Sequence, residues 1–178
     1  AGGVVASRFG DDAALLEVLP WLGLVNPDAS GTNCVLVAIA ADMSAVPGEG
    51  LVWQAPAESP LPESDLVAYQ RQLLGLADDA DSLVFRTDVG SVRAVMAAAP
   101  VGSRGVVLVR SRTVDGGVGV SHAFNVLRLE GVGAGDDGVV FVDGQRGGLA
   151  RVPDGVVDLL FLPVTDGIAM PAGATRVD

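Results

Sequence analysis

The sequence is poor in the residues that carry most protein chemistry. Its 178 residues include one cysteine and one histidine, and all 11 basic residues are arginine. A single cysteine excludes an internal disulfide and a thiolate-rich metal site. Aromatic residues make up only 4% of the chain, so the core has to be built mainly from aliphatic side chains. A site that needs a thiol or an imidazole therefore has to use Cys34 or His122.

Positive charge and long apolar runs are also scarce. Acidic residues number 22 against 11 basic ones, which gives a formal net charge of −11. Nucleic acids and anionic membranes attract cationic surfaces, so we expect neither as a partner. No apolar run approaches the ~20 residues that span a bilayer, and no signal peptide is recognisable. We expect no metal ion or other cofactor, and the charge would suit a basic protein partner.

The N-terminal half has the pattern of helices separated by loops. Loop formers at 26–33 precede the apolar run 35–41, which favours a helix over 34–43, although the run is also compatible with a buried strand. Residues 44–65 are rich in proline and glycine and predict an excursion loop with one short strand at 51–54. Three further helices are expected, over 11–19, over 66–75 after a cap at Ser64 or Asp65, and from a cap at Thr87, Asp88 or Ser91 to a stop at Pro100.

The pattern changes to strands in the C-terminal half. Turns at 115–117 and 131–138 separate segments of strand character. Helices followed by an antiparallel sheet indicate the α+β class. No internal repeat or convincing boundary is present, so we expect one domain over 1–178. The predicted strands are 105–110, 119–129 and 138–143, and 156–163 is a further strand or a short helix.

Cys34 stands at the predicted start of a helix. The dipole and the free N–H groups at a helix N-terminus favour a thiolate, and the same N–H groups can stabilise an oxyanion. A buried structural cysteine is the alternative interpretation. A cysteine nucleophile also needs a base within hydrogen-bond reach and a third group that orients the base.

His122 is the one imidazole that can act as this base, and it lies in the predicted strand 119–129. Asp143 ends the next predicted strand, after the glycine-rich turn. Antiparallel pairing of these strands would place Asp143 beside His122, where its carboxylate can accept from the ring N–H. Asp143-Gly144 is also an ordinary hairpin-turn signal, so the spacing alone leaves both interpretations open.

Three segments carry a family resemblance when they are taken together. They are Asn33-Cys34 before the apolar helix, 121–126 (SHAFNV) on one strand and 140–145 (VFVDGQ) on the next. In this order they resemble the papain-fold toxin domains of bacterial polymorphic toxin systems, the Tox-PL type. The resemblance spans roughly residues 24–150. It implies a papain-like fold with a core at about 24–163, in which a helix presents the cysteine to an antiparallel sheet.

The resemblance also implies a role for each matching residue. Cys34 would be the nucleophile, His122 the base and Asp143 the acid that orients the base. Gln145 follows the Asp-Gly pair, where we expect a supporting role. The family is associated with protein-glutamine deamidation, so the chain is expected to act on a protein that presents a glutamine.

The implied reaction is acyl transfer. The Cys34 thiolate would attack a glutamine side-chain amide, His122 would protonate the leaving ammonia, and water would hydrolyse the thioester to give glutamate. The oxyanion would be held by the Cys34 backbone N–H and by a nearby side chain. Asn33 and Asn26 are both candidates for that side chain, and each is also an ordinary cap or loop residue.

A toxin of this kind would be secreted or delivered into a target cell as part of a larger protein, and it would need a cognate immunity protein. These expectations come from the resemblance. The same fold also supports a papain-like cysteine peptidase or a transglutaminase. A catalytically inactive papain-like binding module, or a structural domain with a buried Cys34, are the alternatives outside enzymes.

Overall fold

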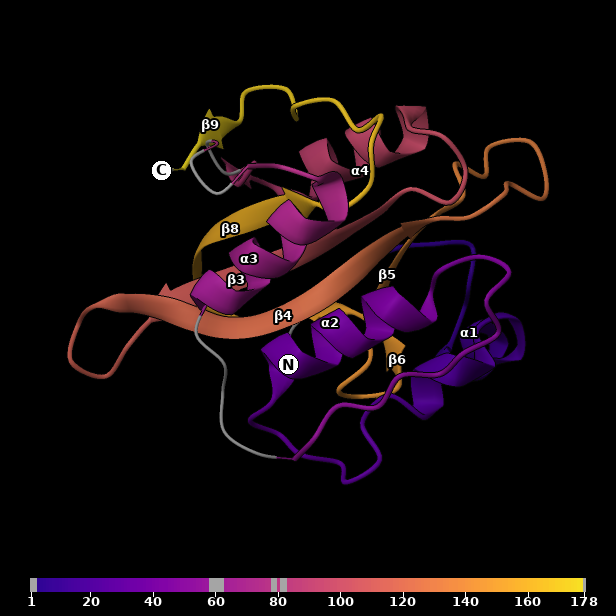
Figure 1. Cartoon of the computed structure of the whole chain (residues 1–178), viewed down its shortest axis with the longest axis horizontal. Coiled ribbons are helices and arrows are strands. Elements are labelled where there is room, and N and C mark those ends of the chain that lie inside the picture. Colours follow the sequence, from indigo (N-terminus) through magenta and orange to yellow (C-terminus); the bar gives the residue numbers. More distant parts are fainter. Residues whose placement is uncertain (1–2, 58–62, 78–79, 81–82, 178) are drawn as a thin grey trace.

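An antiparallel sheet of seven strands runs through the centre of the molecule, whose structure is a computed structural model (Figure 1). The structure describes residues 3–57, 63–77, 80 and 83–177. A separate two-stranded pair joins β1 (Gly3–Val4) to β7 (Arg151–Val152). In their order across the large sheet, the strands are β6 (Gly148–Leu149), β5 (Val139–Asp143), β4 (Val118–Arg128), β3 (Arg104–Arg112), β8 (Val156–Pro163), β2 (Phe85–Thr87) and β9 (Thr175–Arg176).

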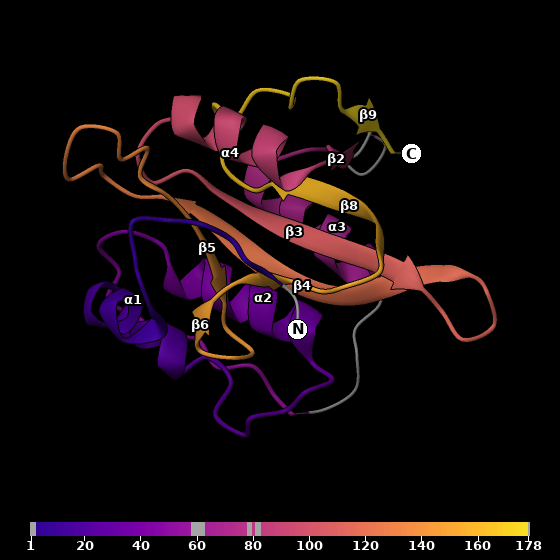
Figure 2. The ribbon, with the colours of Figure 1, turned by 180° about the vertical axis from the view of Figure 1, so that it is seen from behind.

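Helices cover both faces of this sheet, which makes the fold α+β as predicted. Helix α4 (Val89–Ala98) packs on one face, and α2 (Cys34–Ser44) and α3 (Glu63–Leu74) pack on the other (Figures 1 and 2). The short helices α1 (Asp12–Val18) and η1 (Pro20–Gly23) pack against β5 and β6 at the sheet edge.

Alternation along the central strands divides the core between the two faces. Val107 and Val109 of β3 point to the cluster that includes α4, and Val106 and Leu108 point to the cluster that includes α2 and α3. Side chains of a strand alternate between the faces of its sheet, so a strand buried on both sides is apolar throughout. The run at 105–109 has this character, which is why its strand was predictable.

Helix α2 begins at Cys34, as predicted, and the alternative of a buried strand over 35–41 is wrong. The helix continues to Ser44, so Asp42 lies inside it and is fully buried. The expected helix at 11–19 is also present. Helix α3 begins at Glu63, ahead of its expected caps.

The strand expected at 51–54 is absent from the described residues. This segment is irregular, and its backbone is held by groups outside any sheet. Trp53 N donates to Ser44 Oγ at 2.8 Å, and Ala55 N donates to Val25 O at 2.7 Å. Residues 58–62 of the expected excursion lie outside the described residues.

The segment 156–163, left open between strand and helix, is strand β8. It pairs with β3 on one side and with β2 on the other. β2 contains three residues and β9 two, and neither strand is among the predicted ones. Strands this short carry too few alternations to be recognised from a pattern.

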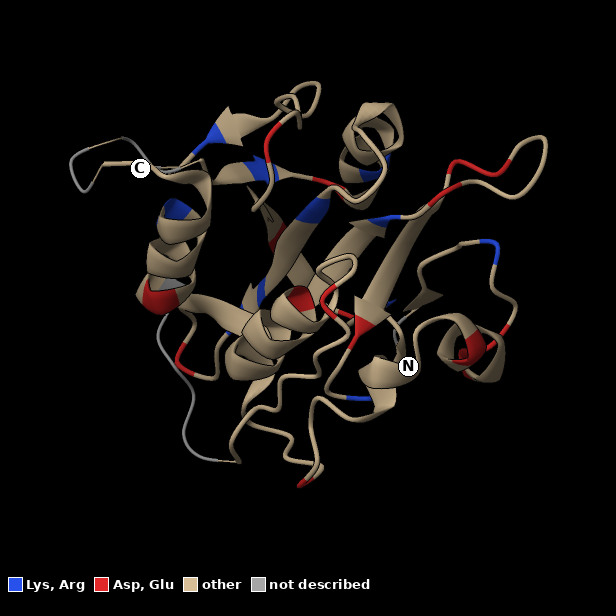
Figure 3. Ribbon diagram, turned by 45° about the vertical axis from the view of Figure 1, so that its right-hand side comes forward, with Lys and Arg blue, Asp and Glu red and all other residues tan. Residues whose placement is uncertain are grey.

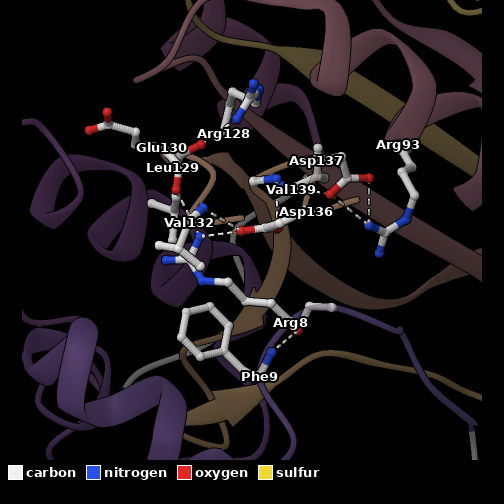
Figure 4. Close-up of polar contacts among 12 residues, drawn as sticks. Arg8, Phe9, Arg93, Arg128, Leu129, Glu130, Val132, Asp136, Asp137 and Val139 are labelled. Carbon is white, nitrogen blue, oxygen red and sulfur yellow. Dashed lines mark hydrogen bonds and ion pairs between the residues drawn. The ribbon is translucent and has the colours of Figure 1, made fainter. Parts of the chain in front are cut away.

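Two ion pairs hold the loop between β4 and β5 in place (Figure 4). Asp136 lies 3.1 Å from Arg8 of the N-terminal segment, and Asp137 lies 3.0 Å from Arg93 of α4. The Asp136 carboxylate also accepts from the backbone N–H groups of Val132 and Gly138. The loop that leads into β5 is therefore fixed to two other parts of the chain.

Charged residues are distributed unequally over these elements (Figure 3). Most of the arginines lie on strands, whereas Asp143 and Asp158 are the acidic residues found in described strands. The excess negative charge is therefore carried by loops and helices.

Candidate active site

The site forms where β5 ends and α2 takes its place beside β4. β5 pairs with residues 125–128 of β4, and no described strand pairs with β4 on this side before Asn125. Helix α2 lies along this part of β4 (Figure 1). Cys34, at the N-terminus of α2, therefore comes close to His122 without belonging to the sheet.

A β-bulge precedes His122. Val109 of β3 pairs with His122, but the next residue, Arg110, pairs with Val120. Ser121 is thus the extra residue, and its hydroxyl donates to Val109 O at 3.2 Å. A bulge bends its strand and redirects the side chains next to it, so His122 sits at the bend.

Asp143 lies beside His122, where the antiparallel pairing was expected to place it. His122 Nε2 is 2.6 Å from Asp143 Oδ2, and the side chains are 14% and 1% exposed. The other carboxylate oxygen accepts from Gln145 N at 3.0 Å. A carboxylate only accepts, so Nε2 carries the proton and Nδ1 is the ring nitrogen left for the thiol of Cys34.

Three influences set the pKa of His122. Burial lowers it, but the hydrogen bond to Asp143, the hydrogen bond to Cys34 and the negative charges of both partners together raise it to about 9. His122 is thus an imidazolium at neutral pH, held between a carboxylate and a sulfur.

Cys34 is half-buried, in contact with the core formed by α2, α3 and the central strands. Because it is the first residue of α2, its backbone N–H has no partner within the helix. No described residue outside the helix accepts from this N–H either. It is therefore free to donate to an oxyanion that forms beside the sulfur.

Asn33, which directly precedes Cys34, is hydrogen-bonded to Asn26. Asn33 is fully buried, and its Nδ2 donates to Asn26 Oδ1 at 3.1 Å and to Pro56 O at 2.9 Å. Asn26 Nδ2 donates to the backbone oxygens of Ser30 and Gln145 at 3.0 and 3.2 Å. The amide hydrogens of both residues are thus committed to loops, and neither amide has a hydrogen left for an oxyanion.

Gln145 differs from Asn33 and Asn26, because only one hydrogen of its amide is used. Its Nε2 donates to Asn33 Oδ1 at 3.4 Å, and no described residue accepts its second hydrogen. The side chain is half-buried. Of the three amides around the site, Gln145 is the one that keeps a free donor.

Gly144 lets the turn after Asp143 approach the helix that carries the cysteine. A Cβ at this position would lie 2.7 Å from Val25 Cγ2 and 2.8 Å from Val37 Cγ1. Asp143-Gly144 does begin the hairpin between β5 and β6, so the turn interpretation and the proximity to His122 hold together.

Replacing Asp143 with asparagine should lower the pKa of His122 from about 9 toward its ordinary 6.5. The amide oxygen of Asn still accepts from Nε2 but carries no charge. NMR titration measures this directly, because the chain has a single histidine. Asp115→Asn, at the exposed tip of the β3–β4 hairpin, is the control and should leave the titration unchanged. An unaltered midpoint in Asp143→Asn would contradict the assignment.

The raised pKa of His122 also makes the free energy of unfolding depend on pH. The pKa of His122 is higher in the folded chain than its ordinary 6.5, so its contribution is fully present below about pH 6.5 and is lost as the pH rises through 9. The free energy of unfolding of the wild type should therefore fall over this range. Asp143→Asn should flatten that fall.

Two buried polar residues on the elements that carry the site were not recognised from the sequence as important. Asn125 of β4 donates to Ala38 O of α2 at 2.8 Å. Asp42 of α2 lies 2.9 Å from Arg104 Nε and accepts from Tyr69 Oη at 2.5 Å. Burial, and then the charge and hydrogen bond of Asp42, raise the pKa of Tyr69. A polar residue inside an apolar segment is the signal that could have found both.

Comparison with protein-family models, with curated proteins and with solved structures finds no match to this chain. Among the described residues, no group of three or more histidine, cysteine, aspartate or glutamate side chains could hold a metal ion. In the same part of the chain, no helix has the length and apolar character that crossing a membrane requires.

Proposed function

We propose that this chain is a cysteine-dependent amide hydrolase with a papain-like fold, and that it deamidates protein glutamines as a toxin effector. The observation that supports it most is the 2.6 Å contact between His122 and Asp143, with Cys34 near enough to the same imidazole to raise its pKa. A nucleophile, a base and an orienting acid are the three parts that cysteine acyl transfer needs. Delivery within a larger toxin and a cognate immunity protein belong to the same proposal and rest on the family resemblance.

The reaction follows from the positions of these groups. The Cys34 thiolate attacks the carbonyl carbon of the amide, and the oxygen takes up the negative charge beside the Cys34 N–H. The His122 imidazolium then donates its proton to the leaving nitrogen, and ammonia departs as the thioester forms. Neutral His122 next removes a proton from water, whose hydroxide attacks the thioester and releases glutamate and Cys34.

The free Nε2 hydrogen of Gln145 makes it the best placed side chain to complete the oxyanion site. Asn33 and Asn26 instead keep the loops around Cys34 in position, because their amide hydrogens are already used. Donors that are fixed before the reaction stabilise developing charge most effectively.

Product analysis tests the proposal and separates the three cysteine reactions. Bacterial and eukaryotic cell lysates would be incubated with the wild type and with Cys34→Ala, and the proteins compared by mass spectrometry. Deamidation raises the mass of an intact protein by about 1 Da, peptidase action cuts the chain, and transglutaminase action joins an amine to a glutamine side chain. Cleavage or cross-linking would replace the deamidase by those enzymes. A wild type that changes no protein would favour the inactive binding module.

A further inference from the structure

A buried amide joins the helix that carries Cys34 to the strand that carries His122. Asn125 is 1% exposed, and its Nδ2 donates to Ala38 O at 2.8 Å. Ala38 follows Cys34 by one helical turn, about 6 Å along the axis. Asn125 follows His122 by three residues, about 10 Å along the strand. The hydrogen bond therefore connects the two elements close to their reacting groups.

Stability alone does not account for this amide. No described residue donates to Asn125 Oδ1, which is buried. A buried acceptor without a partner costs about 1–3 kcal/mol. Ala38 lies inside α2, where the N–H four residues later is the regular partner of its carbonyl, so it does not depend on Asn125. An apolar side chain of similar size would fill the space without an unpaired oxygen.

The packing of α2 against the sheet uses few large side chains. Its buried apolar side chains are all valine or alanine. Small, similar side chains allow a helix to slide or rotate at little cost, whereas a directional hydrogen bond fixes one register. Asp42 anchors the far end of the helix through Arg104, one turn further from Cys34 than Ala38 is.

We propose that Asn125 is a positioning residue, whose hydrogen bond to Ala38 holds α2 on β4 in the register at which Cys34 meets His122. The inference rests on the proposed function of the Cys34–His122 pair. It gives a reason for an amide whose oxygen is left unpaired: the side chain sets a distance between reacting groups, and a displacement of about 1 Å can cost a factor of 100 in rate.

Asn125→Leu separates positioning from stability. The melting temperature should stay the same or rise, because the unpaired oxygen is removed and the volume is kept. The rate at which iodoacetamide alkylates the thiol at pH ~6–7 should fall about tenfold, and the alkylation–pH curve should move to higher pH. Cys34 is the single cysteine of the chain, so alkylation reports on this site alone.

Gln70 supplies a matched control. It is also a fully buried amide with an unpaired oxygen, and its Nε2 donates to Leu83 O and Pro163 O, both at 2.8 Å. It links α3 to other segments and touches none of the reacting groups. Gln70→Leu should lower the melting temperature, because two backbone oxygens lose this donor, and should leave the alkylation–pH curve of Cys34 unchanged.

The outcomes are distinct. If Asn125→Leu alkylates as the wild type does at every pH, the positioning role is wrong and the proposed function stands. If the wild type itself alkylates like an ordinary thiol, the proposed function fails and this inference fails with it. Should the leucine variant not fold, Asn125→Ala removes the same hydrogen bond and leaves space, and the same two measurements decide.

Discussion

Cys34→Ala should reduce amide hydrolysis by about four orders of magnitude or more while the chain remains folded. In the proposed reaction the sulfur forms the covalent intermediate, and no second cysteine can replace it. Because the side chain is half-buried, its truncation should cost about 1 kcal/mol or less in unfolding free energy. The first effect is measured as the rate of deamidation of a protein that the wild type deamidates. The second is measured by chemical denaturation.

Cys34 and His122 should also behave as a unit in the proposed reaction. His122→Ala should cost about as much activity as Cys34→Ala, and the double variant should be little worse than either single one, because each removes the same reaction path. Activity that survives in Cys34→Ala, or losses that multiply in the double variant, would show that the two residues do not act together.

Arg104→Met should produce the largest loss of stability, about 3–5 kcal/mol in unfolding free energy. The Arg104 side chain is 11% exposed and its partner Asp42 is fully buried, so the substitution leaves a carboxylate in the core without its cation. Urea denaturation measures the loss. Replacing Asp42, Arg104 and Tyr69 together with Leu, Met and Phe should recover most of it, because no buried polar group is then left unpaired.

An exposed ion pair provides the control. Arg86, whose side chain is 48% exposed, lies 3.0 Å from Asp158. Arg86→Met should cost less than about 1 kcal/mol, since water screens this contact. If the two methionine variants lost equal stability, the anchoring of α2 by Asp42 and Arg104 would be wrong.

Local patterns predict the elements that carry the site. The loop before Cys34 and the apolar run after it give the start of α2, and the alternation over 119–129 and 138–143 gives β4 and β5. Their antiparallel pairing brings His122 and Asp143 together. These predictions succeed because period and turn chemistry are properties of neighbouring residues.

Features that depend on distant residues could not be predicted in this way. Nothing near Asp42 indicates that Arg104 will neutralise it, and nothing near Asn125 indicates Ala38 as its acceptor. The segment 51–54 looks like a strand from its composition, but Trp53 N donates to the Ser44 hydroxyl and not to a neighbouring strand. The insertion of β8 between β3 and β2 is likewise a result of the whole chain.

The order of the strands has a consequence for when the thiol becomes reactive. Cys34 emerges early during synthesis, or during passage through any channel that admits the N-terminus first, whereas His122 and Asp143 follow much later. β2 closes the sheet only after β8 and β9 have arrived on either side of it. Contacts of such long range form late in folding. Until β4 and β5 have folded against α2, the proposed base and acid are not beside Cys34, so an unfolded chain lacks the arrangement on which the proposed reaction depends.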